Sequence, residues 1–241
     1  MAAGAESTKY KPFCQEVNLI PPGNTIGVCV KYYIQCKCEG GKACKYEDPK
    51  KQKGPNAIEG LHSSWINREI LAMARPADKF VKQYGIVDQF VELGIDCIIN
   101  LQELGEHPIC GEGITSGGFS YTPELFMEKG VHFYNFSWRD MGCPHNELAL
   151  DIVQVMAYHC REKSGRVAVH CHAGLGRTGL VIACYMVYID QVKPKDAVRM
   201  VRQQRPGALQ TSKQESFVTQ FDDWLRGLRR VFPRSTVNLK G

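Results

Sequence analysis

The sequence has no long hydrophobic run, no recognisable leader at its start and no strong excess of charge. The longest apolar stretch, Leu180 to Ile189, is about half as long as a transmembrane helix requires. Met1-Ala2-Ala3-Gly4 opens without basic residues and without an apolar segment behind them, so we expect no signal peptide and no stable membrane insertion. The second residue is Ala, which excludes myristoylation, and the chain does not end in a prenylation box.

Charge and composition exclude further classes of protein. The 30 Lys and Arg residues exceed the 25 Asp and Glu residues by only five, and they form no basic stripe, so we expect no binding to nucleic acid. We see no internal repeat and no low-complexity segment. With 241 residues and 44% apolar content, the chain is expected to form one globular domain with a small extension. Nothing in the sequence indicates the oligomeric state.

Eleven cysteines are spread along the chain, an odd number that does not suggest a disulfide framework. Together with the missing leader, this indicates reduced thiols in the cytoplasm. Four of them fall within a short N-terminal segment: Cys29, Cys36, Cys38 and Cys44. Their spacing differs from the paired C-x2-C pattern of structural zinc sites. We therefore expect packed, reduced cysteines and no cofactor, and keep zinc bound by these four as the alternative.

Hydrophobic periodicity predicts an α/β fold from Ile58 onward, because short apolar runs alternate with helical patterns. The expected architecture is a central, mostly parallel sheet flanked by helices. Helices are expected over 76–93, 147–163, 179–189, 194–204 and 211–230, and strands over 97–101, 132–136 and 167–170. The predicted organisation is an irregular, cysteine-containing N-terminal extension over 1–57, the main domain over 58–232 and a tail over 233–241.

The strongest motif is His170-Cys171-His172-Ala173-Gly174-Leu175-Gly176-Arg177-Thr178-Gly179. A buried strand ends at the cysteine, a glycine-rich turn follows, and an apolar helix begins at the arginine. Such a turn directs backbone N–H groups toward an anion at a helix N-terminus, and Arg177 offers a planar fork for phosphate oxygens. The same groups stabilise Cys171 as a thiolate nucleophile, and the Thr178 hydroxyl can hydrogen-bond to it. We expect bound phosphate to contact His172, Ala173, Gly174, Leu175, Gly176, Arg177 and Thr178.

This motif resembles the C-x5-R loop of the protein tyrosine phosphatase superfamily, and a core-cysteine interpretation explains neither its glycines nor its arginine. The resemblance implies hydrolysis of phosphoprotein through a phosphocysteine intermediate. Low-molecular-weight phosphatases and arsenate reductases share C-x5-R, but their loop lies near the N-terminus. Here the loop lies two-thirds along the chain, which fits those families poorly.

A second motif, Ser137-Trp138-Arg139-Asp140-Met141-Gly142, follows one expected strand and precedes the helix at 147. It resembles the W-P-D loop of the same superfamily, with Arg139 in place of proline. The resemblance implies that Asp140 is the general acid. Glu103 and Glu147 are the alternative acids.

Two further pairs of residues complete the expected site. Gln210-Thr211-Ser212-Lys213-Gln214 resembles the Q-T-x-x-Q segment that positions the hydrolytic water in this superfamily, which implies that role for Gln210 and Gln214; a polar helix cap is the alternative. His170 and Cys171 should point to opposite sides of the strand, so His170 is expected to orient the loop. His172 is expected at the rim of the phosphate site.

The similarity extends over about residues 26–232 to one cytoplasmic, dual-specificity-like group of the superfamily. It implies removal of phosphate from Tyr, Ser and Thr side chains, and a centrosomal or ciliary association. A phosphoinositide phosphatase and a non-catalytic phosphate-binding scaffold are the alternatives. The loop carries His172 and Leu175 where a related lipid phosphatase carries lysine, which weakens the case for a polyphosphorylated headgroup. The scaffold alternative is weakened by the presence of Cys171, Arg177 and Asp140 together.

Overall fold

The computed structural model describes residues 44–52 and 54–231 as alternating strands and helices around one sheet. A short 3-10 turn, Pro49–Lys51, precedes the first strand. The strands are β1 (Ser63–Trp65), β2 (Ile70–Met73), β3 (Ile95–Asn100), β4 (His132–Asn135) and β5 (Arg166–His170). The helices are α2 (Asp78–Gln83), α3 (Ile86–Glu92), α4 (Glu124–Met127), α5 (Asn146–Ala157), continued by a π-helical turn over Tyr158–Glu162, then α6 (Gly176–Ile189), α7 (Pro194–Gln204) and α8 (Ser212–Val231).

The five strands lie in the order β1-β2-β5-β3-β4. Strand β1 is antiparallel to β2, and every other neighbouring pair is parallel. The most central strand, β5, pairs Val167 with Ile70 on one side and with Cys97 on the other. Its carboxyl end therefore lies between the carboxyl ends of β2 and β3, where parallel α/β sheets place their ligand sites.

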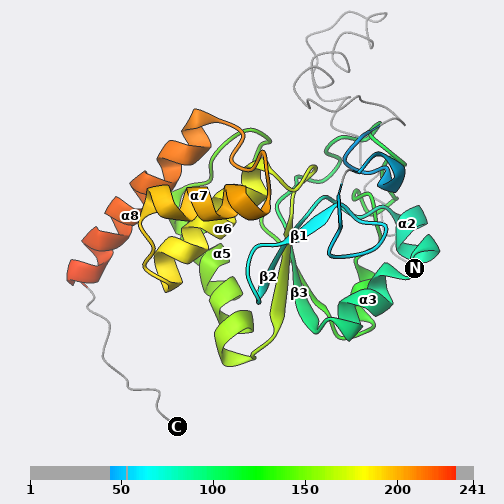
Figure 1. Ribbon diagram of the computed structural model, residues 1–241, viewed down its shortest axis with the longest axis horizontal. Helices are drawn as coiled ribbons and strands as arrows, with labels where there is room; N and C mark the ends of the chain where they lie inside the picture. The colour runs from blue at the N-terminus through cyan, green and yellow to red at the C-terminus, as the bar shows by residue number, and fades with distance from the viewer. Residues whose placement is uncertain (1–43, 53, 232–241) are drawn as a thin grey trace, which may run out of the picture.

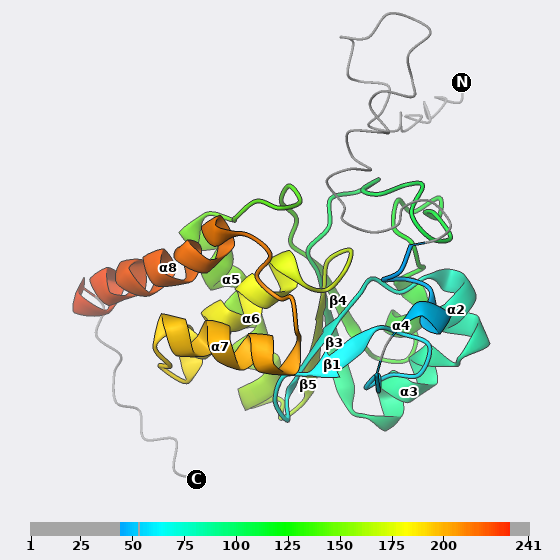
Figure 2. The same ribbon diagram turned by 45° about the horizontal axis from the view of Figure 1, so that its top comes forward.

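Helices cover both faces of the sheet, so alternate residues of each strand enter two separate cores (Figures 1 and 2). Val167 and Val169 of β5 pack in the core under α5, α6, α7 and α8. Ala168, between them, packs in the second core together with residues of α2, α3 and α4. Helix α6 is buried on all sides because it lies between the sheet and three other helices. No helix among the described residues has the length and apolar character needed to cross a bilayer.

The expected α/β architecture is confirmed, and the predicted helix over 194–204 has the observed bounds of α7. The single helix predicted over 76–93 is wrong: the segment forms α2 and α3, which are separated where Gly85 takes a left-handed φ of 59°. Strands β1 and β2 were not predicted. All four residues of β2 are buried, so the alternation that marks a half-buried strand is missing.

The predicted boundary at residue 57 stays a prediction, but buried contacts cross it. The Cys44 and Glu47 side chains both contact the ring of His172, which lies two residues after the end of β5. The segment 44–52 thus packs directly against the loop that follows β5.

The His170 ring is fully buried at the end of β5 and has a partner on each nitrogen. Its Nδ1 lies 3.1 Å from the carbonyl oxygen of Cys171, which requires an N–H donor, so Nε2 accepts from the Tyr121 hydroxyl 2.8 Å away. Burial lowers the pKa of His170 to about 3. The ring is therefore neutral in the folded protein at physiological pH.

His170 should make the protein less stable as the pH falls. The unfolded chain takes up a proton at His170 below about pH 6.5 and the folded chain does not, so stability decreases from there toward pH 3. Between pH 7 and pH 5 this contribution is about 2 kcal/mol. Urea unfolding at the two pH values should show it in the wild type and in His145→Gln, which changes an exposed histidine. His170→Gln should lose that part of the pH dependence. If the free energy of unfolding changes equally with pH in all three proteins, His170 is not the group responsible.

Candidate active site

The segment between β5 and α6 is folded so that its carbonyl groups point outward. The carbonyl oxygen of His172 accepts from the backbone N–H of Arg75, and those of Ala173 and Gly174 accept from the guanidinium of Arg205. The Leu175 carbonyl accepts from the backbone N–H of Leu209. With the carbonyls held outside, the N–H groups of the loop are directed to its inside, which is the arrangement of an anion-binding nest.

Gly174 makes this loop possible. It takes a φ of 66°, and a Cβ at this position would lie 2.0 Å from the carbonyl oxygen of Met73 in β2. Only glycine accepts both the left-handed conformation and the close approach of the neighbouring strand. The tight fit keeps the loop against the carboxyl end of the sheet.

Cys171 is 3% exposed and lies at the base of this loop, where it joins the core on the α6 side of the sheet. Two buried polar atoms of the same loop, Arg177 Nε and Thr178 Oγ1, have no hydrogen-bond partner within the described chain. Unsatisfied buried donors are costly, and a phosphate oxygen and a cysteine thiolate are the groups that would satisfy them. The residues present therefore fit a phosphoryl group in the loop.

Arg177 is completely buried and is held by residues from the ends of two neighbouring strands. Both oxygens of Glu106 accept from its guanidinium, with Nη1 to Oε2 at 2.8 Å and Nη2 to Oε1 as the second bond. Nη1 also donates to the carbonyl oxygens of Leu101 and Trp138, each at 2.9 Å. Burial raises the pKa of a carboxyl, but the charge of Arg177 outweighs it and holds the pKa of Glu106 well below its usual range.

Asp140 lies beside this arginine, with Oδ1 3.1 Å from Arg177 Nη2. Its other oxygen, Oδ2, is 3.3 Å from Nε2 of His107, which also lies 3.1 Å from Glu106 Oε1. Burial raises the pKa of Asp140, but the His107 hydrogen bond and the Arg177 charge outweigh it, and the pKa is lowered. The loop after β4 thus presents a carboxylate to the cysteine loop.

Gln210 and Gln214 also reach the cysteine loop. A Cβ on Gly176 would lie 2.8 Å from Oε1 of Gln210 and 3.0 Å from Nε2 of Gln214, so both amides lie over this glycine. Thr211 and Gln214 form a reciprocal cap at the start of α8: Gln214 N–H donates to Thr211 Oγ1 and Thr211 N–H to Gln214 Oε1. The helix starts only at Ser212, so Gln210 precedes it and is not a helical i, i+4 partner of Gln214.

The expected position of His172 at the rim is wrong, because its ring is 3% exposed and turned away from solvent. It stacks on His107 with ring centroids 4.3 Å apart, and its Nε2 lies 3.2 Å from Glu47 Oε1. Burial lowers its pKa, but hydrogen bonds with Cys110, Cys44 and Glu47 outweigh it and raise the pKa to about 10. Leu175 of the same loop is buried as well.

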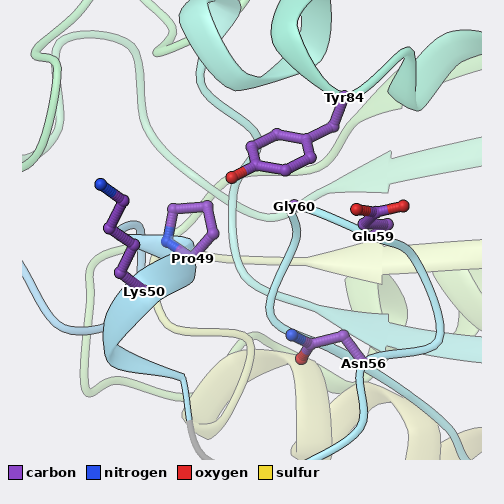
Figure 3. A pocket seen from close by; sticks show the side chains of 6 residues that line it. All are labelled: Pro49, Lys50, Asn56, Glu59, Gly60 and Tyr84. Carbon is purple, nitrogen blue, oxygen red and sulfur yellow. The ribbon is translucent and has the colours of Figure 1, made fainter.

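The remaining predicted residues lie apart from this centre. Glu103 and Glu147, the alternative acids, are both exposed. Of the four N-terminal zinc candidates, Cys29, Cys36 and Cys38 lie outside the described residues. A pocket of about 340 Å³ lies between the 49–60 segment and Tyr84 at the end of α2, and none of the predicted site residues lines it (Figure 3).

Sequence reasoning gave no role to Glu106 and His107. Both follow β3, as Asp140 follows β4, and β3 and β4 are parallel neighbours. Polar residues just beyond the carboxyl ends of adjacent parallel strands are the signal that could have indicated them. Arg75 follows β2 in the same manner.

These observations agree with the comparisons with known proteins. Residues 121–221 match the protein-tyrosine phosphatase family model. A structure of kinase-associated phosphatase with its catalytic-site cysteine replaced by serine aligns at TM-score 0.57 and 23% identity, covering 73% of this chain and 98% of that one. A structure of PTPMT1 in complex with PI(5)P aligns at TM-score 0.54 and 18% identity, over 68% of this chain and 96% of that one. The chain therefore has the fold of the cysteine-based phosphatases, and its residues 121–221 are similar to the protein-tyrosine phosphatase family.

Among curated proteins, the chain is 44% identical over 213 residues to protein tyrosine phosphatase domain-containing protein 1 of Danio rerio, and 42% identical over 233 residues to the Mus musculus protein of that name. These alignments cover 87% and 95% of this chain but 30% of each relative, so the chain spans less than a third of their length. It is also 31% identical over 108 residues to the human dual specificity protein phosphatase CDC14C, covering 44% of this chain and 23% of that protein. The resemblance inferred from the motifs is confirmed.

Glu106→Gln should destabilise the protein, because it leaves the buried charge of Arg177 with Asp140 as its nearest carboxylate. Removing one partner of a buried ion pair costs about 3 kcal/mol or more, measured as the free energy of unfolding in phosphate-free buffer. Added tungstate or phosphate should recover part of the loss by supplying a counter-charge in the loop. Glu103→Gln, on the same loop but exposed, should stay within about 0.5 kcal/mol of wild type. Equal losses in both variants would contradict the role of Glu106.

Proposed function

We propose that the protein is a cysteine-dependent phosphatase that removes phosphate from phosphoprotein through a phosphocysteine intermediate. The observation that carries the proposal is the convergence of Cys171, Arg177 and Asp140 on one loop whose backbone N–H groups are directed inward. The single test is turnover of a small aryl phosphate by the purified chain. A cytoplasmic location and a centrosomal or ciliary association stay predictions of the sequence resemblance.

In the first step, the Cys171 thiolate attacks phosphorus and the ester oxygen leaves. The inward N–H groups and the guanidinium of Arg177 stabilise the charge on the equatorial phosphoryl oxygens. Asp140 donates its proton to the leaving oxygen, which departs as an alcohol or phenol. The phosphoryl group is then bonded to sulfur.

In the second step, water attacks the phosphocysteine and Asp140 accepts its proton, so phosphate leaves and the thiolate is restored. Gln210 and Gln214 are suited to orient this water, because both amides lie over Gly176 of the loop. Thr178 Oγ1, buried at the helix start, is suited to hydrogen-bond the departing thiolate.

Burial raises the pKa of Asp140, but the His107 hydrogen bond and the Arg177 charge outweigh it, and the lowered pKa by itself disfavours a general acid. A bound phosphate dianion competes for the same guanidinium and adds negative charge next to the carboxylate. Both effects raise the pKa of Asp140 when substrate is present. Substrate binding thereby places the proton on the residue that must donate it.

The charge at the site favours a single phosphoryl group over a polyphosphorylated headgroup. His172 is the only residue in the loop besides Arg177 that carries a positive charge near neutral pH, and its ring faces the buried carboxylate of Glu47. The loop therefore offers the one guanidinium of Arg177 for phosphate and no second free cation for a neighbouring phosphate. The resemblance to relatives named dual specificity phosphatase, such as human CDC14C, supports a protein substrate.

Cys171→Ser should reduce turnover of an aryl phosphate to less than about a thousandth of wild type, because serine has no accessible alkoxide near neutral pH. Binding of phosphate analogues should persist, since the N–H groups and Arg177 are unchanged. Steady-state kinetics and isothermal titration with tungstate measure the two quantities. Turnover by Cys171→Ser well above that level would show that Cys171 is not the nucleophile.

Asp140→Asn should lower kcat by about two to four orders of magnitude, the usual range for a lost general acid. The wild type requires a thiolate and a protonated Asp140 together, which gives a bell-shaped profile on the acid side of neutral. The basic limb of that bell should flatten in the variant. Glu147→Gln is the matched control at an exposed carboxylate. If the bell-shaped pH profile persists in Asp140→Asn but is lost in Glu147→Gln, Glu147 is the general acid.

Phosphopeptides that carry phosphotyrosine, phosphoserine or phosphothreonine in the same sequence should all be hydrolysed. The domain is shorter than those of the tyrosine-specific enzymes, and the segment before it does not resemble their substrate-stacking loop, so a shallow site is expected. The comparison is made by kcat/KM. A preference for phosphotyrosine above about a thousandfold, some 4 kcal/mol of transition-state binding, would indicate a deep, tyrosine-specific site.

A further inference from the structure

A second cluster of reactive side chains lies next to the cysteine loop. It consists of Cys44, from the first described segment, Cys110, from the loop after β3, and His172, from the loop after β5. All three are buried, and their two sulfur atoms and one ring nitrogen lie within 4.8 Å of one another. The two cysteines are not joined in a disulfide.

The distance between Cys44 and His172 is that of two ligands that share one tetrahedral metal ion, and Cys110 Sγ lies within 4.8 Å of both. With Zn–S bonds of about 2.3 Å and Zn–N bonds of about 2.0 Å, tetrahedral geometry places sulfur and nitrogen ligands about 3.5–3.6 Å apart. Cys44 Sγ lies 3.6 Å from His172 Nε2. Two ligands with bonds of about 2.0 Å lie about 3.3 Å apart in the same geometry. Glu47 Oε1 lies 3.2 Å from that same nitrogen.

Glu47 is the acidic residue next to these three ligands, with Oε1 3.2 Å from the His172 nitrogen, but it does not belong to the group of ligand atoms that lie within 4.8 Å of one another. Its carboxylate must therefore shift toward the sulfur atoms to become the fourth ligand. Its side chain is fully buried, and Oε2 has no hydrogen-bond partner within the described part of the chain. Oε1 accepts from Arg75 Nε at 2.8 Å, and ligating carboxylates are commonly held by such an outer hydrogen bond. Two thiolates, one carboxylate, a divalent cation and the Arg75 guanidinium sum to zero net charge, as a buried site requires.

We propose that Cys44, Cys110, His172 and Glu47 form a structural zinc site that fixes the N-terminal segment to the catalytic loop. Two sulfur ligands with one imidazole and one carboxylate select zinc over calcium and magnesium, which take oxygen ligands. The site differs from the one expected on Cys29, Cys36, Cys38 and Cys44, because it takes only Cys44 from that set. The metal is structural, since the protein supplies all four ligands.

A second cluster with metal-ligating groups, Glu106, His107 and Asp140, carries no such inference. Both of its carboxylates are already bound to Arg177 and belong to the catalytic site. Cys44 and Cys110 take no part in the catalytic mechanism.

The contacts of Arg75 explain how the three segments meet. This buried arginine donates to Glu47 and to the carbonyl oxygens of Glu106, His107 and Cys110, all at 2.8–3.0 Å. It therefore brings the 106–110 loop to the first described segment. Zinc would join both to the residue that follows the nucleophile in the chain.

The test measures zinc by mass spectrometry in the 241-residue Cys171→Ser protein, purified and equilibrated with equimolar zinc in reducing buffer. This background removes the nucleophile as an alternative zinc ligand, and the readout does not depend on turnover. We expect about one zinc ion per chain, retained through gel filtration. A content below about 0.1 per chain would overturn the proposal.

Two variants in the same background locate the ion. Cys110→Ser should lower zinc content at least about tenfold, because it removes one of two thiolates. The triple variant Cys29→Ser/Cys36→Ser/Cys38→Ser should keep one ion, and so should Cys160→Ser, which changes a buried cysteine outside the cluster. Loss of zinc in the triple variant with retention in Cys110→Ser would overturn the proposal and assign zinc to the upstream cysteines.

X-ray absorption at the zinc edge covers the case in which Cys110→Ser fails to fold, since it needs no ligand variant. The Cys171→Ser protein should show two sulfur neighbours at about 2.3 Å and two nitrogen or oxygen neighbours at about 2.0 Å. Three or four sulfur neighbours would overturn the proposal.

Thermal unfolding tests whether the zinc is structural. The melting temperature should fall when zinc is removed by a chelator and recover when zinc is restored. An unchanged melting temperature would exclude a structural role.

Discussion

The buried guanidinium of Arg177 is the constraint around which the other parts of the site are arranged. A positive charge with no exposure to solvent must be paired and hydrogen-bonded, or folding becomes very costly. Glu106 and the carbonyl groups of Leu101 and Trp138 meet this requirement from the loops after β3 and β4. The same arginine is fixed to the cysteine loop by its place in the chain. Pairing one charge thus assembles three loops at one edge of the sheet.

Glycine and arginine residues hold the loop itself from outside. Gly174 allows contact with β2, and Arg205 and the backbone of Arg75 take the loop carbonyls. None of these groups needs to touch the substrate. The two arginines bind the loop carbonyls from outside, so the N–H groups point inward before an anion binds. The loop then does not have to reorganise during the reaction.

The sequence was most informative where the interacting residues lie close together along the chain. The cysteine loop is one contiguous segment, and its strand, turn and helix were all predicted. Asp140 was found because its neighbours resemble a known motif. Glu106 was not, because its partner Arg177 is 71 positions away and neither local periodicity nor spacing records the pairing. The burial of His172 was missed for the same reason, since its partner Glu47 lies 125 positions away.

The two histidines beside the nucleophile show how surroundings rather than residue type decide charge. His170 has a hydroxyl and a carbonyl as partners, and burial leaves it neutral. His172, equally buried, faces the carboxylate of Glu47 and holds a proton in the absence of metal.

The ring of His172 also stacks on His107, which contacts Asp140. Contacts therefore run without a break from the first described segment, through the residue after the nucleophile, to the proposed acid. Residues joined in this way share partners, so their effects on catalysis should not be additive. A change at Glu47 should therefore alter the effect of a change at His107 or Asp140, although neither Glu47 nor His107 touches the phosphoryl group in the mechanism proposed here.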